Sequence, residues 1–253
     1  MDTKCDAKEN LLPEDRYVFI HIGKSAGTAI REAIAKQFCE NEVCPVFFPG
    51  QISELNEKEL NQYKFISAHI GYDQAAPLSS NLFTVLRNPF DRVISLYYYW
   101  KEIAGDEGGP IIAKQLSFED FIESTDASVI VDMRNTQTWQ LAHGHQAFVR
   151  QEFRSQYSED QLLKKAIDNL ENLKVVGLQE NIPKFIDDIN AVFGWNVEAV
   201  NRSNATSKRP TVADVPVALK RKLYKYVELD LELYFYALKR FGFQRSCLTS
   251  IAR

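Results

Sequence analysis

Short apolar runs alternate with longer amphipathic stretches along most of this chain. The apolar runs predict buried strands at 17–22, 64–68, 82–87 and 173–178, with a less regular one at 45–48. The stretches between them repeat apolar positions with a helical period and predict helices at 28–38, 90–103, 117–124, 128–142, 159–171, 179–193 and 216–240, the last with a break. This alternation is typical of βαβ units, and therefore of an α/β fold with a central parallel sheet of four to five strands flanked by helices.

Composition and helix-end signals fit a single domain. The chain has 253 residues, of which 45% are hydrophobic, and this is enough for one sizeable core without disulfides or metal ions. We expect the domain to span 16–245, between polar tails at 1–15 and 246–253. A capping-box signature at Ser158 indicates the start of the helix predicted at 159–171, and Gly194 is placed to end the helix predicted at 179–193.

The first predicted strand runs directly into the segment HIGKSAGT at 21–28, which is followed by a predicted helix. A helix N-terminus offers unpaired backbone N–H groups and the positive end of its dipole, and glycines let the backbone approach a ligand closely. Lys24 adds a full positive charge. The segment therefore predicts a cradle for a phosphate-like or sulfate-like anion, with an ordinary strand-to-helix turn as the alternative.

The cradle does not have the spacing of an ATP-binding Walker A loop. Gly23, Lys24 and Ser25 imitate the end of the pattern G-x-x-x-x-G-K-[ST]. The first glycine of that pattern would fall at Val18, inside the predicted strand, so the long phosphate-wrapping loop is missing. The shorter cradle suits one 5′-phosphate with a further group attached.

A second strand-to-helix junction carries another anion-binding signal. The predicted strand 82–87 leads into RNPFDRVIS at 87–95, where Pro89 lies near the first helical turn and its missing N–H costs nothing. Arg87 would project from the end of a parallel strand, on the same sheet edge as Lys24, where open α/β folds bind ligands. We therefore expect these two basic residues to share one crevice.

Together, the segments at 21–28 and 87–95 resemble motifs of the sulfotransferases that use 3′-phosphoadenosine 5′-phosphosulfate (PAPS), particularly the carbohydrate-type branch related to the heparan sulfate 2-O- and 6-O-sulfotransferases. The first segment is similar to that family's 5′-phosphosulfate loop, H-I-P-K-T-G-G-T, and the second to its 3′-phosphate motif, R-[DN]-P-x-x-R-x-x-S. Weaker similarities extend the resemblance roughly over residues 16 to 242, at 133–141, 176–180 and 229–234.

The resemblance implies a P-loop-kinase-like sulfotransferase fold and a two-part donor site. The residues that would hold the 5′-phosphosulfate are Lys24, Ser25, Ala26, Gly27 and Thr28. The residues that would hold the 3′-phosphate are Arg87 and Ser95, joined by Arg209 from a polar segment at 201–213 that would fold over it. Ala26 is the departure that matters, because the family has glycine there and a Cβ would crowd a turn that needs positive φ.

Sulfuryl transfer to a hydroxyl needs a deprotonated acceptor, in-line attack and neutralisation of the charge on the leaving phosphate. Lys24 can lie against the bridging oxygen, while backbone N–H groups of the cradle hold the nonbridging oxygens. The transferred group carries less charge than a phosphoryl group, so this chemistry requires no metal ion, and the sequence lacks an obvious pair of aspartates for one.

Neutral imidazole has the pKa best matched to proton abstraction near neutral pH, and the chain has four histidines. His69 follows the predicted strand 64–68 and can face the crevice, and the resemblance places a histidine in a similar context. We therefore expect His69 to be the catalytic base rather than a structural residue. His21 would orient the cradle or contact the ligand. His143 and His145 lie in a predicted loop, on the surface or in the acceptor groove.

Three aromatic and loop features fit either a structural or a functional interpretation. The glycine-rich loop at 104–110 would be a rim over the acceptor site or a simple connector. Four consecutive aromatic residues at 97–100 point in different directions on a helix, so we expect most of them in the core. Trp139 is the better candidate for stacking on a sugar.

Charge and cysteine content bear on partners and compartment. A net charge of −4 gives no general attraction to nucleic acid. The four cysteines include no C-x-x-C pair, which suits free thiols in a reducing compartment. Residues 1–16 lack the apolar core of a signal peptide, and no apolar run is long enough to span a membrane. We therefore expect a soluble, cytoplasmic protein, or one of the Golgi lumen if the chain has been trimmed.

These observations predict an enzyme that transfers a sulfuryl group from PAPS to a hydroxyl of a glycan or glycoconjugate, with His69 as base and Lys24 stabilising the leaving group. PAPS would be released as 3′,5′-adenosine bisphosphate (PAP). The alternatives are a nucleotide or small-molecule kinase of related fold and a noncatalytic nucleotide-binding module. Val18 and the lack of an acidic strand end for Mg²⁺ disfavour the kinase, and the presence of Lys24 and His69 together with the 3′-phosphate motif disfavours the module.

Overall fold

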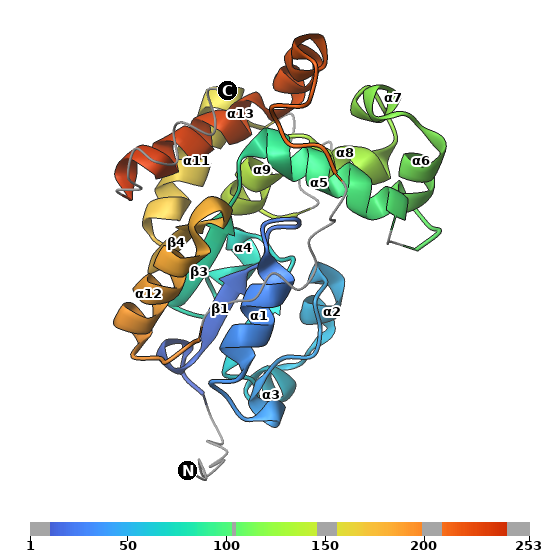
Figure 1. Cartoon of the computed structure of the whole chain (residues 1–253). Coiled ribbons are helices and arrows are strands. Elements are labelled where there is room, and N and C mark those ends of the chain that lie inside the picture. The colour runs from blue at the N-terminus through green and yellow to red at the C-terminus, as the bar shows by residue number, and fades with distance from the viewer. Residues whose placement is uncertain (1–10, 103–104, 146–155, 199–208, 242–253) are drawn as a thin grey trace.

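A four-stranded parallel sheet forms the centre of the protein (Figure 1). The structure is a computed structural model, and its described part comprises residues 11–102, 105–145, 156–198 and 209–241. The strands are β1 (Tyr17–Ile20), β2 (Phe65–Ala68), β3 (Asn81–Leu86) and β4 (Val175–Leu178). Their order is β2-β1-β3-β4, and every pairing is parallel, which confirms the expected α/β fold.

The fifth strand expected at 45–48 does not form. In this region only Val43 pairs with the sheet, through an isolated parallel bridge to Phe65. The Cys44 N–H still donates to the Phe65 carbonyl at 2.8 Å, but Pro45 has no N–H group to continue a regular ladder, although the Phe47 carbonyl accepts the His69 N–H further on.

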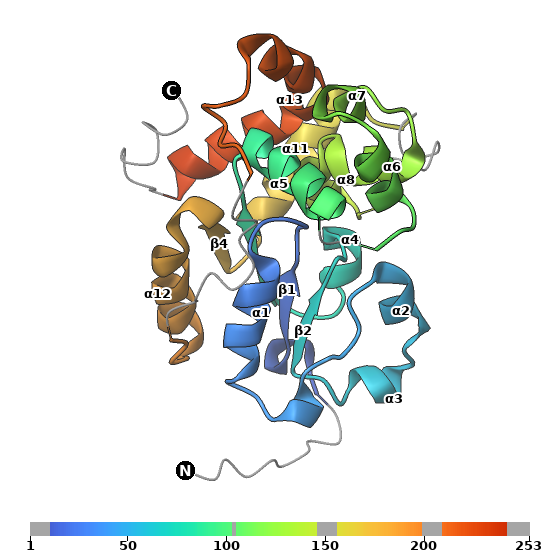
Figure 2. The same ribbon diagram turned by 45° about the vertical axis from the view of Figure 1, so that its right-hand side comes forward.

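Helices cover both faces of the sheet, so each strand is buried on both sides (Figures 1 and 2). The helices on one face are α1 (Gly27–Ala35) and α12 (Ile182–Phe193). The helices on the other face are α9 (Thr136–Ala142), α11 (Glu159–Glu171) and the second half of α13 (Val217–Arg240). Within β1, Phe19 packs into the first core and Val18 into the second, as the period-two geometry of a strand requires.

A third core lies among the helices that follow β3. These are α5 (Pro89–Glu102), α6 (Gly109–Gln115), α7 (Phe118–Ile122), α8 (Ala127–Met133) and the first half of α13. Helix α13 serves two cores because it kinks at Val227, whose φ of −128° is not helical. Leu223 packs on α5 to α8, whereas Leu233 packs against the sheet. The break expected in this last helix is therefore confirmed.

The single helix expected at 128–142 is two helices, α8 and α9. They meet at Asn135, which has a left-handed φ of 44°. Its backbone N–H donates to the Tyr226 carbonyl at 2.9 Å, and its side-chain oxygen accepts the Asp230 N–H at 3.1 Å. These contacts with α13 favour the turn over a continuous helix, and no helical periodicity signals them.

Local helix-end signals are confirmed where they were read. The Ser158 side chain accepts the Gln161 N–H at the start of α11, and the Gln161 side chain accepts the Ser158 N–H in return. Gly194 has a φ of 70° and ends α12. Shorter elements that were not predicted are α2 (Pro49–Glu54), α3 (Glu57–Leu60), α4 (Tyr72–Ala75) and the 3-10 turns Pro13–Asp15, Glu40–Glu42 and Gln179–Asn181.

The cysteines depart from the expectation of free thiols. Cys44 is a buried free thiol, but Cys39 is disulfide-bonded. Disulfides persist mainly in oxidising compartments, so the cysteine content no longer supports a cytoplasmic location. The cytoplasmic location therefore stays a prediction. Among the described residues, no helix combines the length and the apolar character needed to cross a membrane. Most of the tails expected at 1–15 and 246–253 lies outside the described residues.

Candidate active site

The predicted anion cradle connects β1 to α1 through a tight turn. Lys24 and Ala26 both have left-handed backbone conformations, with φ of 67° and 65°. Helix α1 begins at Gly27, where an added Cβ would lie 2.0 Å from the His21 ring, so only glycine fits. Ala26 therefore has a strained backbone conformation, which a glycine at this position would adopt without strain.

Replacing Ala26 by glycine is expected to raise the free energy of unfolding by about 0.5–1 kcal/mol. Relief of the left-handed strain contributes about 1–2 kcal/mol, and the greater entropy of glycine in the unfolded chain offsets about 0.4–1 kcal/mol of it. Urea unfolding measures the difference. The matched variant Ala29→Gly, inside α1, is expected to lower the free energy of unfolding by about 0.5–1 kcal/mol. A loss of stability in both variants would contradict this account of the turn.

Lys24 lies at the centre of a group of cations. Its carbonyl oxygen accepts a hydrogen bond from Nη1 of Arg87 at 2.6 Å, and its ammonium lies over the Tyr99 ring at 3.4 Å from the centroid. Burial, together with the positive charges of Arg87 and Arg209, lowers the pKa of Lys24 to about 7. An anion bound here would restore the protonated form, since it opposes both causes.

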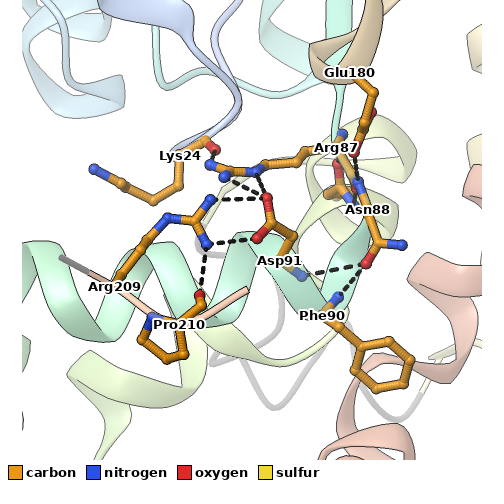
Figure 3. A network of polar contacts seen from close by, with 9 residues as sticks. Lys24, Arg87, Asn88, Phe90, Asp91, Glu180, Arg209 and Pro210 are labelled. Carbon is orange, nitrogen blue, oxygen red and sulfur yellow. Dashed lines mark hydrogen bonds and ion pairs between the residues drawn. The ribbon is translucent and has the colours of Figure 1, made fainter. Parts of the chain in front are cut away.

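Arg87 and Arg209 meet at the carboxylate of Asp91 (Figure 3). Arg87 donates to Oδ2 from Nε at 2.9 Å and from Nη2 at 2.5 Å. Arg209 donates from Nη1 to Oδ1 at 2.5 Å and from Nη2 to Oδ2 at 3.0 Å. Burial alone would raise the pKa of the Asp91 carboxyl, but the hydrogen bonds and charges of the two arginines hold it below its ordinary value.

This arrangement brings two of the residues expected at the 3′-phosphate, Arg87 and Arg209, together across the fold. Arg209, which is 118 positions from Asp91, reaches the strand end that carries Arg87. Ser95 is buried on α5, the helix that begins two residues after Arg87. Of the expected 201–213 segment, the structure describes only residues 209–213, because residues 199–208 lie outside the described part.

Sequence reasoning missed the residues that hold the Arg87 backbone. The Gln137 side chain accepts the Arg87 N–H and donates to the Arg87 carbonyl, both at 3.0 Å. Glu180 accepts the Asn88 N–H at 2.8 Å, while the Asn88 side chain caps α5 by accepting the Asp91 N–H at 3.2 Å. Gln137 and Glu180 lie in the weakly similar segments 133–141 and 176–180, which is the one signal that could have found them.

The cradle holds a polar group suited to an oxyanion. The Ser25 hydroxyl is buried and has no hydrogen-bond partner among the described residues. A buried hydroxyl without a partner is costly unless a ligand supplies one. Together with the cations at Lys24 and Arg87, it fits a site for an anionic group such as a phosphosulfate. Thr28, in the first turn of α1, is exposed.

His69 lies next to the cradle in a defined tautomer. Its Nδ1 is 2.9 Å from the His21 carbonyl oxygen, which can only accept, so the proton is on Nδ1 and Nε2 keeps its lone pair. A Cβ added at Gly23 would lie 3.9 Å from Cε1 of His69. Burial lowers the pKa of His69, and His145 lowers it further, so the ring is neutral near pH 7.

The other three histidines occupy distinct environments. His21 is buried, stacks on Phe19 and supports the cradle, and burial holds its pKa well below the ordinary value. His143 lies 2.9 Å from Asp73. His145 lies beside His69, with ring centroids 6.0 Å apart.

Trp139 does not serve as the exposed sugar platform that the sequence suggested, because it is buried in the core under the sheet. Tyr97 and Trp100 are core residues as expected, whereas the Tyr99 ring makes a cation–π contact with the Lys24 ammonium. Among the described residues, no group of three or more histidine, cysteine or acidic side chains is arranged to hold a metal ion.

A family model described as "Sulfotransferase family" matches residues 10–237 of the chain. Among solved structures, the chain is similar to mouse sulfotransferase SULT7A1 complexed with PAP, at a TM-score of 0.40 and 12% identity. That match covers 96% of this chain and 90% of the other. No curated protein sequence matches the chain.

Proposed function

Because this chain belongs to the sulfotransferase family and is a PAPS-dependent sulfotransferase, we propose that it sulfates a hydroxyl group of a carbohydrate with His69 as the base and Lys24 as the group that stabilises the leaving phosphate. The observation that carries the proposal is the bare Nε2 of His69 beside the cationic cradle. PAPS supplies the activated sulfuryl group, the acceptor supplies the attacking hydroxyl, and the chain supplies the base and the cations.

His69 is set up to take one proton from the acceptor. Its Nδ1–H is held by the His21 carbonyl, which leaves the lone pair on Nε2, and burial lowers the pKa of the ring so that it stays neutral. As the acceptor oxygen forms its bond to sulfur, the bond from sulfur to the leaving phosphate oxygen breaks and the acceptor proton moves to Nε2. Burial keeps the base neutral, because water would otherwise favour the charged ring.

Lys24 and the turn around it neutralise the charge that develops on the leaving phosphate. Protonated Lys24 would release its contact with the Tyr99 ring and turn toward the bridging oxygen. The Ser25 hydroxyl and the backbone N–H groups at Gly27 and Thr28 would hold the nonbridging oxygens. Arg87, Ser95 and Arg209 would hold the 3′-phosphate.

A ligand panel tests the donor assignment. PAP is expected to raise the melting temperature of the protein more than 5′-AMP or ATP with Mg²⁺, because only PAP offers both a 3′- and a 5′-phosphate without requiring a metal ion. Release of PAP from PAPS in the presence of glycan acceptors then tests turnover. Stabilisation by ATP with Mg²⁺ alone would overturn the donor assignment.

Replacing Arg209 by methionine is expected to weaken PAP binding by about 10- to 100-fold, because a charge-assisted hydrogen bond is worth about 1.5–3 kcal/mol. Affinity for 5′-AMP, which lacks the 3′-phosphate, should change by less than about threefold. Titration calorimetry measures both ligands. The matched variant Arg221→Met removes an exposed cation of α13 and should leave both affinities unchanged. An equal loss for PAP and 5′-AMP would place Arg209 elsewhere in the donor site.

A further inference from the structure

His69 has two neighbouring rings that the donor site does not use. Phe48 and His145 each have a ring centroid 6.0 Å from that of His69, while the His21 ring lies closer, at 4.3 Å. His21 is buried and belongs to the cradle. Phe48 and His145 are therefore the ring neighbours of the base that lie outside the cradle.

The Phe48 ring is unusually exposed for a rigidly held phenylalanine. Its side chain is 59% exposed, although the backbone around it is fixed. The Phe47 carbonyl accepts the His69 N–H at 2.7 Å, and the Gln51 side chain accepts the N–H groups of both Phe47 and Phe48. Phe48 also precedes Pro49, which restricts it to an extended conformation. The ring is therefore held beside the base with an apolar face toward solvent.

The ring of the preceding residue, Phe47, is not exposed in the same way. Phe47 is partly buried, and the Arg31 guanidinium lies 4.3 Å from its centroid. An apolar ring left in water gives up the free energy that burial would provide, which a ligand could recover. An aromatic face of this kind suits the C–H face of a flat, ring-shaped ligand.

His145 supplies the polar side of the same space. Its Nε2 is 2.8 Å from Oδ1 of Asp132, and a carboxylate oxygen only accepts, so Nε2 carries the proton. Nδ1 of His145 is then an acceptor for a hydroxyl group. Asp132 fixes this tautomer in the way that a carboxylate orients a functional imidazole.

We propose that Phe48 and His145 form an acceptor subsite for a pyranose ring, which stacks on Phe48, donates a hydroxyl to His145 and presents its accepting hydroxyl to Nε2 of His69. The pairing of an apolar platform with a hydroxyl acceptor selects a polyhydroxylated ring over a phenol, which would need only the platform. This subsite rests on the proposed function, because it takes His69 as the base.

The test measures binding of methyl pyranosides to the enzyme saturated with PAP. Methyl glucoside, galactoside, N-acetylglucosaminide and glucuronide serve as probes, with 2-naphthol as the aromatic comparison, and saturation-transfer NMR reports their affinities. The sugar that binds best is expected to lose at least about tenfold in affinity in Phe48→Ala and in His145→Ala, and less than about threefold in Phe48→Tyr. In turnover, Phe48→Ala should raise the KM for that sugar more than it lowers kcat.

Two controls separate the subsite from the donor site. Phe235→Ala removes another exposed phenylalanine, 45% exposed on α13, and should leave sugar binding unchanged. PAP affinity, measured by calorimetry, should be the same in all these variants. Unchanged sugar binding in Phe48→Ala, or a clear preference for 2-naphthol over every pyranoside, would overturn the subsite while PAP binding persists. Absence of PAP binding to the unmodified enzyme would overturn the proposed function first.

Discussion

Replacement of His69 by glycine or alanine is expected to lower kcat by about 10²- to 10⁴-fold, the usual contribution of a general base. The acceptor hydroxyl would keep its proton, because the imidazole whose Nε2 lone pair lies beside the cradle would be gone. PAP affinity should change by less than about threefold, since the residues proposed to hold the donor phosphates are unchanged. Single-turnover release of PAP measures the chemical step directly.

Two further measurements distinguish a base from a structural histidine at this position. Added imidazole should restore part of the activity of His69→Gly, because it can occupy the vacated space and accept the proton. His143→Gln removes a histidine that contacts Asp73 and should keep kcat within about threefold of the unmodified enzyme. Normal turnover in His69→Ala would show that the base is a different group.

Replacement of Lys24 by methionine is expected to lower kcat by about 10²- to 10³-fold, comparable to the loss of one oxyanion donor. Methionine keeps the length and apolar stem of the side chain but cannot neutralise the leaving phosphate. Lys24→Arg keeps the charge and should retain more activity than Lys24→Met. Equal activities in the two variants would mean that the charge at this position does not act on the reaction.

The pH dependence of kcat/KM tests the same residue, because the pKa shifts fix the direction in which kcat/KM should change. Lys24 must be protonated to act, and its pKa is lowered to about 7, so kcat/KM should fall as pH rises through about 7. His69 must be neutral, and its pKa lies below the ordinary value, so kcat/KM should rise with pH below that value. The alkaline limb should disappear in Lys24→Arg, because a guanidinium does not titrate in this range.

Binding of PAP should also show the lysine by proton uptake. Anionic phosphates raise the pKa of Lys24, so at pH 8 the free enzyme is mostly neutral at this residue and takes up a proton on binding. Calorimetry in two buffers with different ionisation enthalpies measures this uptake. Lys24→Arg should take up none from this position. Equal uptake in the two proteins would assign the proton to another group.

Much of the fold could be predicted because it follows from local periodicity. Strands and helices bury apolar residues at spacings of two and of three to four, and these spacings are visible in the sequence. The predictions failed where a distant contact overrides the local pattern. Asn135 divides a helix because Tyr226 and Asp230 bind it from α13. The fifth strand fails for a local reason instead, because Pro45 has no N–H group to continue the ladder.

The candidate site divides in the same way. Lys24, Ser25 and Arg87 stand at junctions of a strand and a helix, so short motifs indicate them and parallel strands bring them to one edge of the sheet. Trp139 fits a helical surface pattern equally well as a core pattern, and only packing under the sheet shows that it is buried. The disulfide at Cys39 has no local signal either.

The sequence by itself determined the parallel sheet and the cradle at the start of α1, and it indicated the residues that we propose bind two phosphates. These properties depend on near neighbours along the chain, whose types and spacings are readable directly. Only the tertiary structure decided that Asp91 joins Arg87 to Arg209, that His69 presents Nε2 and that Phe48 stays exposed beside it. Contacts across 118, 48 and 21 positions set those features, the first two being hydrogen bonds and the last a ring contact. Such contacts depend on how the whole chain packs.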